Sequence, residues 1–240
     1  MDLTWIVIPL GIVAGALTTV AGVGGGLVIT LALAALWDPH AALAVTAPAL
    51  LLGNVHRLWL FRRDVDRTVA LRLAAPAVVG ATAGGLVTAA VPDGPLRWLL
   101  LGVTALAFAR ECGWISPPGR GVWLVGGGLL VGVLTATTGG GGLLLAPLML
   151  AAQLRGATFI ATGALVASSI HVARLVTYGG TGLLGPAELP VALVTGLAIL
   201  LGNTAGRRLR PRLGDRMCHQ LTWIVLVGGL LLALLGLGRS

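Results

Sequence analysis

Two glycine clusters are the part of this sequence whose residue types and spacing most directly indicate a binding chemistry. Residues 22–26 read Gly-Val-Gly-Gly-Gly, and residues 139–142 are four consecutive glycines between two apolar stretches. Each glycine costs a helix about 1 kcal/mol relative to alanine, so both clusters should break the surrounding helices. A helix that begins after such a break has free N–H groups and a positive partial charge at its N-terminus, which together attract anions.

A glycine can bring its backbone close to a ligand because no Cβ atom blocks the contact. The glycines expected to do so are Gly24, Gly25, Gly26, Gly140, Gly141 and Gly142. The alternative is that the clusters only let helices pack closely through small residues. Because two clusters occur at matching positions in the two halves of the chain, we favour the binding role.

Two further stretches carry polar side chains at helical spacing. Asn54 and Arg57 are three residues apart and share a helix face, and His171 and Arg174 have the same spacing. Ser168 lies one turn before His171. A guanidinium group has forked donors that suit oxyanions, so we expect these five residues in a substrate pathway. Two alternatives stay open: the arginines could extend to the membrane interface, and the histidine could carry a coupled proton or only be hydrogen-bonded.

The sequence gives little support for an enzymatic function or for a metal site. Ser168 and Ser169 stand near His171, but a serine and a histidine three apart on one helix rarely have the geometry for nucleophilic attack. We therefore expect no enzyme activity. A metal site would need clustered ligands, and the four histidines are scattered along the chain. Cys112 and Cys218 are isolated, so neither a metal nor another cofactor is expected.

The composition indicates which elements must position these residues. Of the 240 residues, 57% are hydrophobic and 10% are charged, and the mean hydropathy is +0.98. These values exclude an ordinary soluble domain and a disordered chain. They predict an all-α polytopic membrane protein, and the length allows about eight to ten membrane segments. The net charge of +8 comes from arginines in short loops, so it indicates membrane topology and not nucleic-acid binding.

The apolar segments form two similar series. They cover residues 4–21, 27–37, 41–61, 68–91, 96–109, 122–138, 143–154, 157–178, 189–206 and 221–237. The polar stretch 110–121 separates a first membrane repeat, residues 1–109, from a second, residues 122–240. A shift of about 117 positions places Thr18 on Thr135 and Arg57 on Arg174, and it superposes the glycine clusters. The sequence therefore predicts an internal duplication.

Loop charge predicts the relative orientation of the two repeats. The arginine-rich loop is at residues 62–72, after the third segment, in the first half, but at residues 207–216, after the fourth, in the second. Arginine-rich loops stay in the cytoplasm, so equivalent loops should lie on opposite faces. This predicts two inverted repeats, with either five spans per half or three spans and a re-entrant hairpin at each glycine cluster. Such repeats are frequent in secondary transporters, which bind substrate near the membrane midplane.

These motifs resemble a known family. Residues 21–26 and residues 138–147, which end at Pro147, resemble the glycine motifs of the TauE/SafE sulfite exporters, also called toluene sulfonate uptake permeases. The Gly80-x-Thr82-x-Gly84 stretch and its counterpart at residues 202–206 resemble the later segment of that family. Leu31 stands where the first-half motif would have a proline. The resemblance covers nearly the whole chain and implies a multi-pass transporter of sulfite, organosulfonates or related anions.

We therefore expect a secondary transporter that moves small sulfur-containing anions across the cell membrane by alternating access. A channel or transporter for another small solute, including a cation, and a non-transporting scaffold are the alternatives. Glycine breaks beside arginines, with no carboxylate inside the apolar segments, favour an anion. The expected partners are a small anionic substrate and the lipid bilayer, without nucleic acid, and a homodimer is left open.

Overall fold

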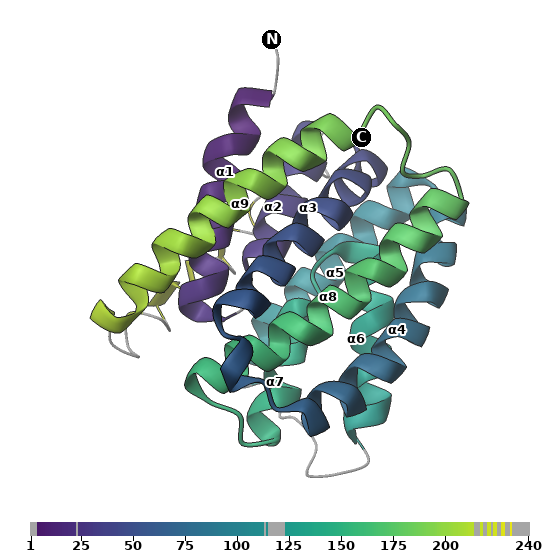
Figure 1. The fold of residues 1–240 in the computed structure, drawn as a ribbon. Coiled ribbons are helices and arrows are strands. Elements are labelled where there is room, and N and C mark those ends of the chain that lie inside the picture. Colours follow the sequence, from purple (N-terminus) through teal and green to yellow (C-terminus); the bar gives the residue numbers. More distant parts are fainter. Residues whose placement is uncertain are drawn as a thin grey trace.

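The computed structural model describes residues 4–22, 24–112, 114 and 123–213, together with scattered residues between 217 and 231. Over these residues the chain is all-helical (Figure 1), as the sequence predicts. The helices are α1 (Thr4–Ala21), α2 (Gly25–Leu36), α3 (Pro39–Leu60), α4 (Arg67–Ala90), α5 (Asp93–Glu111), α6 (Trp123–Thr138), α7 (Gly142–Ala151), α8 (Gly156–Gly180) and α9 (Leu189–Leu209), with short 3₁₀ turns at Arg62–Asp64 and Arg210–Arg212. Most of the predicted connector, residues 110–121, and of the predicted last segment, residues 221–237, lies outside the described residues.

Four of the described helices are long and apolar enough to cross a membrane. They are α3, α4, α8 and the stretch Leu189–Arg212 that contains α9. Four shorter apolar stretches lie in α1, α2, α6 and α7. The 12 residues of α2 and the 10 of α7 rise only about 15–18 Å, roughly half of a hydrocarbon core. The described part of the chain therefore supports a multi-pass membrane protein, and it supports the expected eight to ten segments only in part.

Capping residues explain where α3 and α4 begin. Asp38 accepts a hydrogen bond from the N–H of Ala41 at 2.8 Å, and Pro39 occupies the first turn of α3. Asp66 caps α4 in the same way, through the N–H of Val69 at 3.0 Å. The first of these caps sets the start of α3, the helix that carries Asn54 and Arg57.

Small residues allow two helix pairs to pack with their backbones in close contact. α1 lies along α9, where a Cβ atom added to Gly15 would stand 2.3 Å from the carbonyl oxygen of Ile199. α4 lies along α6, where a Cβ on Gly80 would stand 2.0 Å from the carbonyl oxygen of Leu129. In each pair the contacts advance along both helices together, so the two partners run in the same direction. Such packing through small residues is typical of helices in membranes.

α3 and α8 cross the centre of the bundle side by side (Figure 1). Arg174, near the end of α8, donates a hydrogen bond to the carbonyl of Leu43, near the start of α3, so these two helices run in opposite directions. α3 also packs against α9, and α8 against α4. The central pair therefore joins the two peripheral pairs into one bundle.

The outer surface of the bundle is apolar, with polar residues gathered at its ends. Large side chains such as Leu71, Val176 and Leu201 are exposed along the helices, as expected for surfaces that face lipid. At one end, which we call the arginine end, a surface pocket is lined by residues 59–64 and Arg207. Arg207 lies over the Phe61 ring at 5.9 Å, so the loop after α3 and the end of α9 meet there.

Candidate functional site

Both glycine clusters break the chain between consecutive helices. Gly22 and Gly24 have φ angles of 83° and 100° between α1 and α2, and Gly139 has a φ of 68° between α6 and α7. Residues with a Cβ atom rarely adopt these angles, which explains why glycines stand there. The breaks allow α2 and α7 to begin inside the bundle, as the sequence predicts.

The two breaks lie against each other. A Cβ atom added to Gly140 would stand 2.6 Å from Leu27 Cδ1, and one added to Gly139 would stand 2.6 Å from Thr30 Oγ1. Both neighbours belong to α2. The N-terminal turns of α2 and α7 are therefore brought together, although more than 100 residues separate them in the sequence.

A cavity of about 70 Å³ accessible to water lies where these two turns meet α3, α8 and α9. It has room for several water molecules, and so for a small polyatomic ion. Six glycines of the two breaks line it: Gly22, Gly24, Gly26, Gly139, Gly140 and Gly142. Asn54, Arg57, His171 and Asn203 contribute polar side chains, together with Thr18 and Thr135. No carboxylate is among the lining residues that the structure describes.

The starts of both short helices supply positive partial charge to this cavity. The first hydrogen bond of α2 runs from the N–H of Val28 to the carbonyl of Gly24, so the preceding N–H groups have no partner within the helix. In α7 the corresponding bonds reach back to the carbonyls of Gly140 and Gly141. Because Gly26 and Gly142 have no side chains, the backbone at both starts remains open to the cavity.

Arg57 places a full positive charge at the same cavity. Its side chain is 4% exposed, and its guanidinium group donates to the carbonyl of Thr18 at 3.2 Å and to the amide oxygen of Asn54. Its Nε atom is buried without a hydrogen-bond partner. Within the described structure no carboxylate pairs with this arginine. A buried, unpaired cation is costly unless an anion binds beside it.

The amide of Asn203 holds three helices together beside Arg57. It donates to the carbonyl of Gly53 in α3 at 2.7 Å and accepts from the hydroxyl of Thr19 in α1 at 2.9 Å. The side chain is 1% exposed, so both bonds are shielded from solvent. Asn203 therefore fixes the position of α9, which carries it, against the α3 turn that presents Asn54 and Arg57.

Arg174 has different surroundings from Arg57. It is fully buried, but it donates to the carbonyl of Leu43 at 3.1 Å and to the hydroxyl of Tyr178 at 3.3 Å, and it lies 3.1 Å from Nδ1 of His171. It does not line the cavity, whereas His171 does. The hydroxyl of Ser168 donates to the carbonyl of Ala164 at 2.7 Å and also lies outside the lining.

The structure thus brings together most of the residues expected from the sequence. Those at the cavity are Gly24, Gly26, Gly140, Gly142, Asn54, Arg57 and His171, whereas Gly25, Gly141, Ser168 and Arg174 are not among its lining residues. Gly25 and Gly141 face the preceding helices, where an added Cβ would stand 2.0 Å from the hydroxyls of Thr18 and Thr135. Sequence reasoning missed Thr18, Thr135 and Asn203 as cavity residues, although the repeat alignment had already paired the two threonines.

A comparison with known families decides the class of the protein. The family model described as Sulfite exporter TauE/SafE matches residues 7–236, nearly the whole chain. The chain belongs to the TauE/SafE family. It is accordingly a multi-pass integral protein of the cell membrane, in a family of transporters and not of enzymes. No curated protein and no solved structure matches this TauE/SafE chain.

Proposed function

We propose that this TauE/SafE protein is a secondary transporter that carries sulfite or a small sulfonate through the cavity between the two glycine breaks. The observation that carries the proposal is Arg57. It is a buried guanidinium with no described carboxylate partner, on a cavity that the N-terminal turns of α2 and α7 also line. All three elements favour negative charge.

The chemistry of the cavity suits a small oxyanion. Forked guanidinium donors and backbone N–H groups can each take one oxygen of a sulfite or sulfonate group. Asn54 turns its amide oxygen toward Arg57, and its amide nitrogen donates to the carbonyl of Leu50. The arginine is thereby oriented before an anion arrives. The described lining residues include no carboxylate and so offer no charged ligand for a cation.

We further propose that residues 1–109 and 122–240 are two inverted repeats joined by the connector 110–121. The pairing of α1 with α9 is matched by that of α6 with α4, and both pairs run parallel. α3 and α8, which the repeat alignment equates, run in opposite directions. These relations support a two-fold axis that lies in the membrane plane and passes near the cavity. In secondary transporters with such an axis, alternating access commonly occurs by rocking of one repeat against the other.

Counterflow in proteoliposomes tests the proposed substrate. Purified protein is reconstituted into liposomes that contain unlabelled sulfite, and the uptake of radiolabelled sulfite is measured. External methanesulfonate, chloride and sodium ions are each added as a competitor. We expect uptake that depends on internal sulfite and that methanesulfonate inhibits. The Arg57→Gln variant should lose this uptake, and Arg155→Gln, which changes an exposed arginine, should keep it. Equal counterflow by wild type and Arg57→Gln would contradict the proposal.

A further inference from the structure

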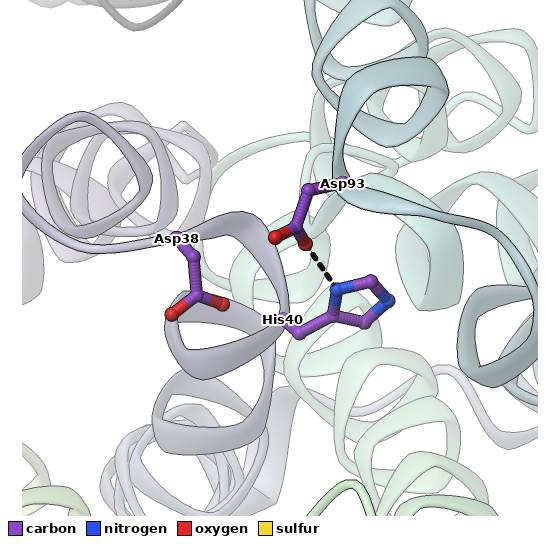
Figure 2. A group of neighbouring side chains, drawn as sticks. All are labelled: Asp38, His40 and Asp93. Atoms are coloured by element: carbon purple, nitrogen blue, oxygen red, sulfur yellow. Dashed lines mark hydrogen bonds and ion pairs between the residues drawn. The ribbon is translucent and has the colours of Figure 1, made fainter. Parts of the chain in front are cut away.

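A second polar cluster lies at the end of the bundle opposite the arginine end. Asp38 directly precedes α3, His40 lies in its first turn, and Asp93 begins α5 (Figure 2). One ligand atom from each side chain lies within 4.8 Å of the other two. Because α3 is 22 residues long, about 33 Å separates this cluster from the arginine end.

The imidazole of His40 is held by a backbone group on a third helix. Its Nε2 atom lies 3.0 Å from the carbonyl oxygen of Thr88, near the end of α4. A carbonyl oxygen can only accept a hydrogen bond, so Nε2 carries the proton. Figure 2 shows Nδ1 directed at the carboxylate of Asp93, with which it forms a hydrogen bond, so a proton lies between the two atoms. A metal ion that replaces this proton would be met by the lone pair of Nδ1. Histidines that bind metals are commonly oriented in this way, by donation from the other ring nitrogen to a carbonyl.

We propose that Asp38, His40 and Asp93 form a binding site for a divalent transition metal ion of the Zn²⁺ type. Two carboxylates and one neutral imidazole give mixed oxygen and nitrogen donors and balance the charge of the ion. The imidazole favours Zn²⁺ over Mg²⁺ and Ca²⁺, which prefer oxygen ligands alone. A water molecule completes a four-coordinate shell, and the carbonyl of Thr88 fixes the histidine.

The three side chains can reach this geometry through small rotations. One carboxylate oxygen of Asp38 caps α3, which leaves the second oxygen for the metal. In a tetrahedral Zn²⁺ site the ligand atoms stand about 3.3 Å apart. The Asp38 carboxylate must therefore approach by no more than about 1.5 Å, and His40 and Asp93, which already contact each other, must separate slightly. The side chains of His40 and Asp93 are 22% and 48% exposed, so an ion can enter from the aqueous side.

A bound ion would connect the start of α3 to the start of α5. The alternative for the same geometry is a plain ion pair between protonated His40 and Asp93. The two arrangements differ in their response to metal. Coordination requires all three side chains, whereas the ion pair neither needs Asp38 nor responds to Zn²⁺.

Metal titration of the full-length protein in detergent micelles separates the two arrangements. Protein stripped with EDTA is titrated calorimetrically with ZnCl₂, and with MgCl₂ as the comparison. We expect saturable binding of one Zn²⁺ per chain, with Mg²⁺ much weaker. His40→Ala and Asp93→Asn should each weaken Zn²⁺ binding by at least about tenfold. Asp38→Asn should do the same while it preserves the helix cap, because asparagine caps as well as aspartate.

Matched controls stand at the other end of α3. His56→Ala and Asp64→Asn change the same residue types away from the cluster and should leave Zn²⁺ binding unchanged. Size-exclusion profiles establish that each variant is folded, and the visible absorption of bound Co²⁺ reports coordination independently. Wild-type binding that the three cluster variants leave unchanged, or no binding by the wild type, would overturn the metal site in favour of the ion pair.

Discussion

The Nη2 atom of Arg174 donates a 3.1 Å hydrogen bond to the backbone carbonyl of Leu43, a residue 131 positions earlier in the chain. The bond joins the end of α8 to the start of α3 at the centre of the bundle. The same guanidinium group also contacts Tyr178, whose ring lies 5.2 Å from the guanidinium carbon and whose hydroxyl donates to the carbonyl of Ala136 in α6. Arg174 is therefore the centre of a buried network that connects α3, α6 and α8.

Replacement of Arg174 should reduce stability more than it changes transport affinity. Arg174→Gln removes the hydrogen bonds that the guanidinium group donates to the carbonyl of Leu43 and the hydroxyl of Tyr178, and hydrogen bonds to charged groups contribute about 1.5–3 kcal/mol. We expect a lower midpoint of thermal unfolding in detergent and less protein in the membrane. The half-saturation concentration for sulfite, measured per folded molecule, should stay close to the wild-type value. A strong rise in that value would assign Arg174 to the substrate pathway.

Arg57 should respond in the opposite way. Arg57→Gln removes a buried charge that no described carboxylate compensates, so the unfolding midpoint should not fall. The half-saturation concentration should rise at least about tenfold, since hydrogen bonds to charged groups contribute about 1.5–3 kcal/mol. Arg57→Lys should restore only part of this loss, because an ammonium group lacks the forked donors. Uptake kinetics normalised to membrane abundance measure both variants, and full activity of the lysine variant would show that charge alone suffices.

The neighbouring glycines Gly25 and Gly26 allow a matched test of the first break. A Cβ on Gly26 would stand 3.3 Å from Leu50 Cδ1, the flexible end of a side chain that can move. A Cβ on Gly25 would stand 2.0 Å from the carbonyl oxygen of Ala14, which is backbone and cannot. Gly26→Ala should therefore fold normally and transport poorly, because the added methyl enters the cavity. Gly25→Ala should lower the unfolding midpoint. Normal uptake by Gly26→Ala would place the substrate elsewhere.

Local chemistry made much of this arrangement predictable. The glycine runs predicted both helix breaks, because the left-handed backbone at Gly22, Gly24 and Gly139 depends on residue type alone. Helical spacing placed Asn54 beside Arg57, and the Asn54 amide does accept a hydrogen bond from the guanidinium group of Arg57. These features lie within a few residues of one another, which is why a single sequence suffices for them.

Contacts between segments that are distant in the sequence could not be predicted from local sequence patterns. The alignment of the repeats treated Arg57 and Arg174 as equals. Of the two, only Arg57 lines the cavity, whereas Arg174 is bound to the carbonyl of Leu43 near the start of α3. The histidines looked scattered in the sequence, although Asp93 reaches His40 across 53 residues once α5 begins beside α3. Neither partner could be assigned without the packing of the helices.

The arrangement of the loops yields a topology prediction that the structure sharpens. Residues 62–64 and Arg207 line one surface pocket, so the loop after α3 and the end of α9 lie at the same end of the bundle. Arginine-rich loops remain cytoplasmic, so both should be inaccessible from outside the cell.

Single cysteines at Arg63 and Arg208, on a background without Cys112 and Cys218, should react with an impermeant maleimide only after the membrane is opened. A cysteine at Gly180, where an added Cβ meets no atom within 4 Å, should react in intact cells because α8 ends at the opposite face. Labelling of Arg63→Cys and Arg208→Cys from opposite sides of the membrane would remove the inverted-repeat proposal, because parallel repeats would place these two loops on opposite faces.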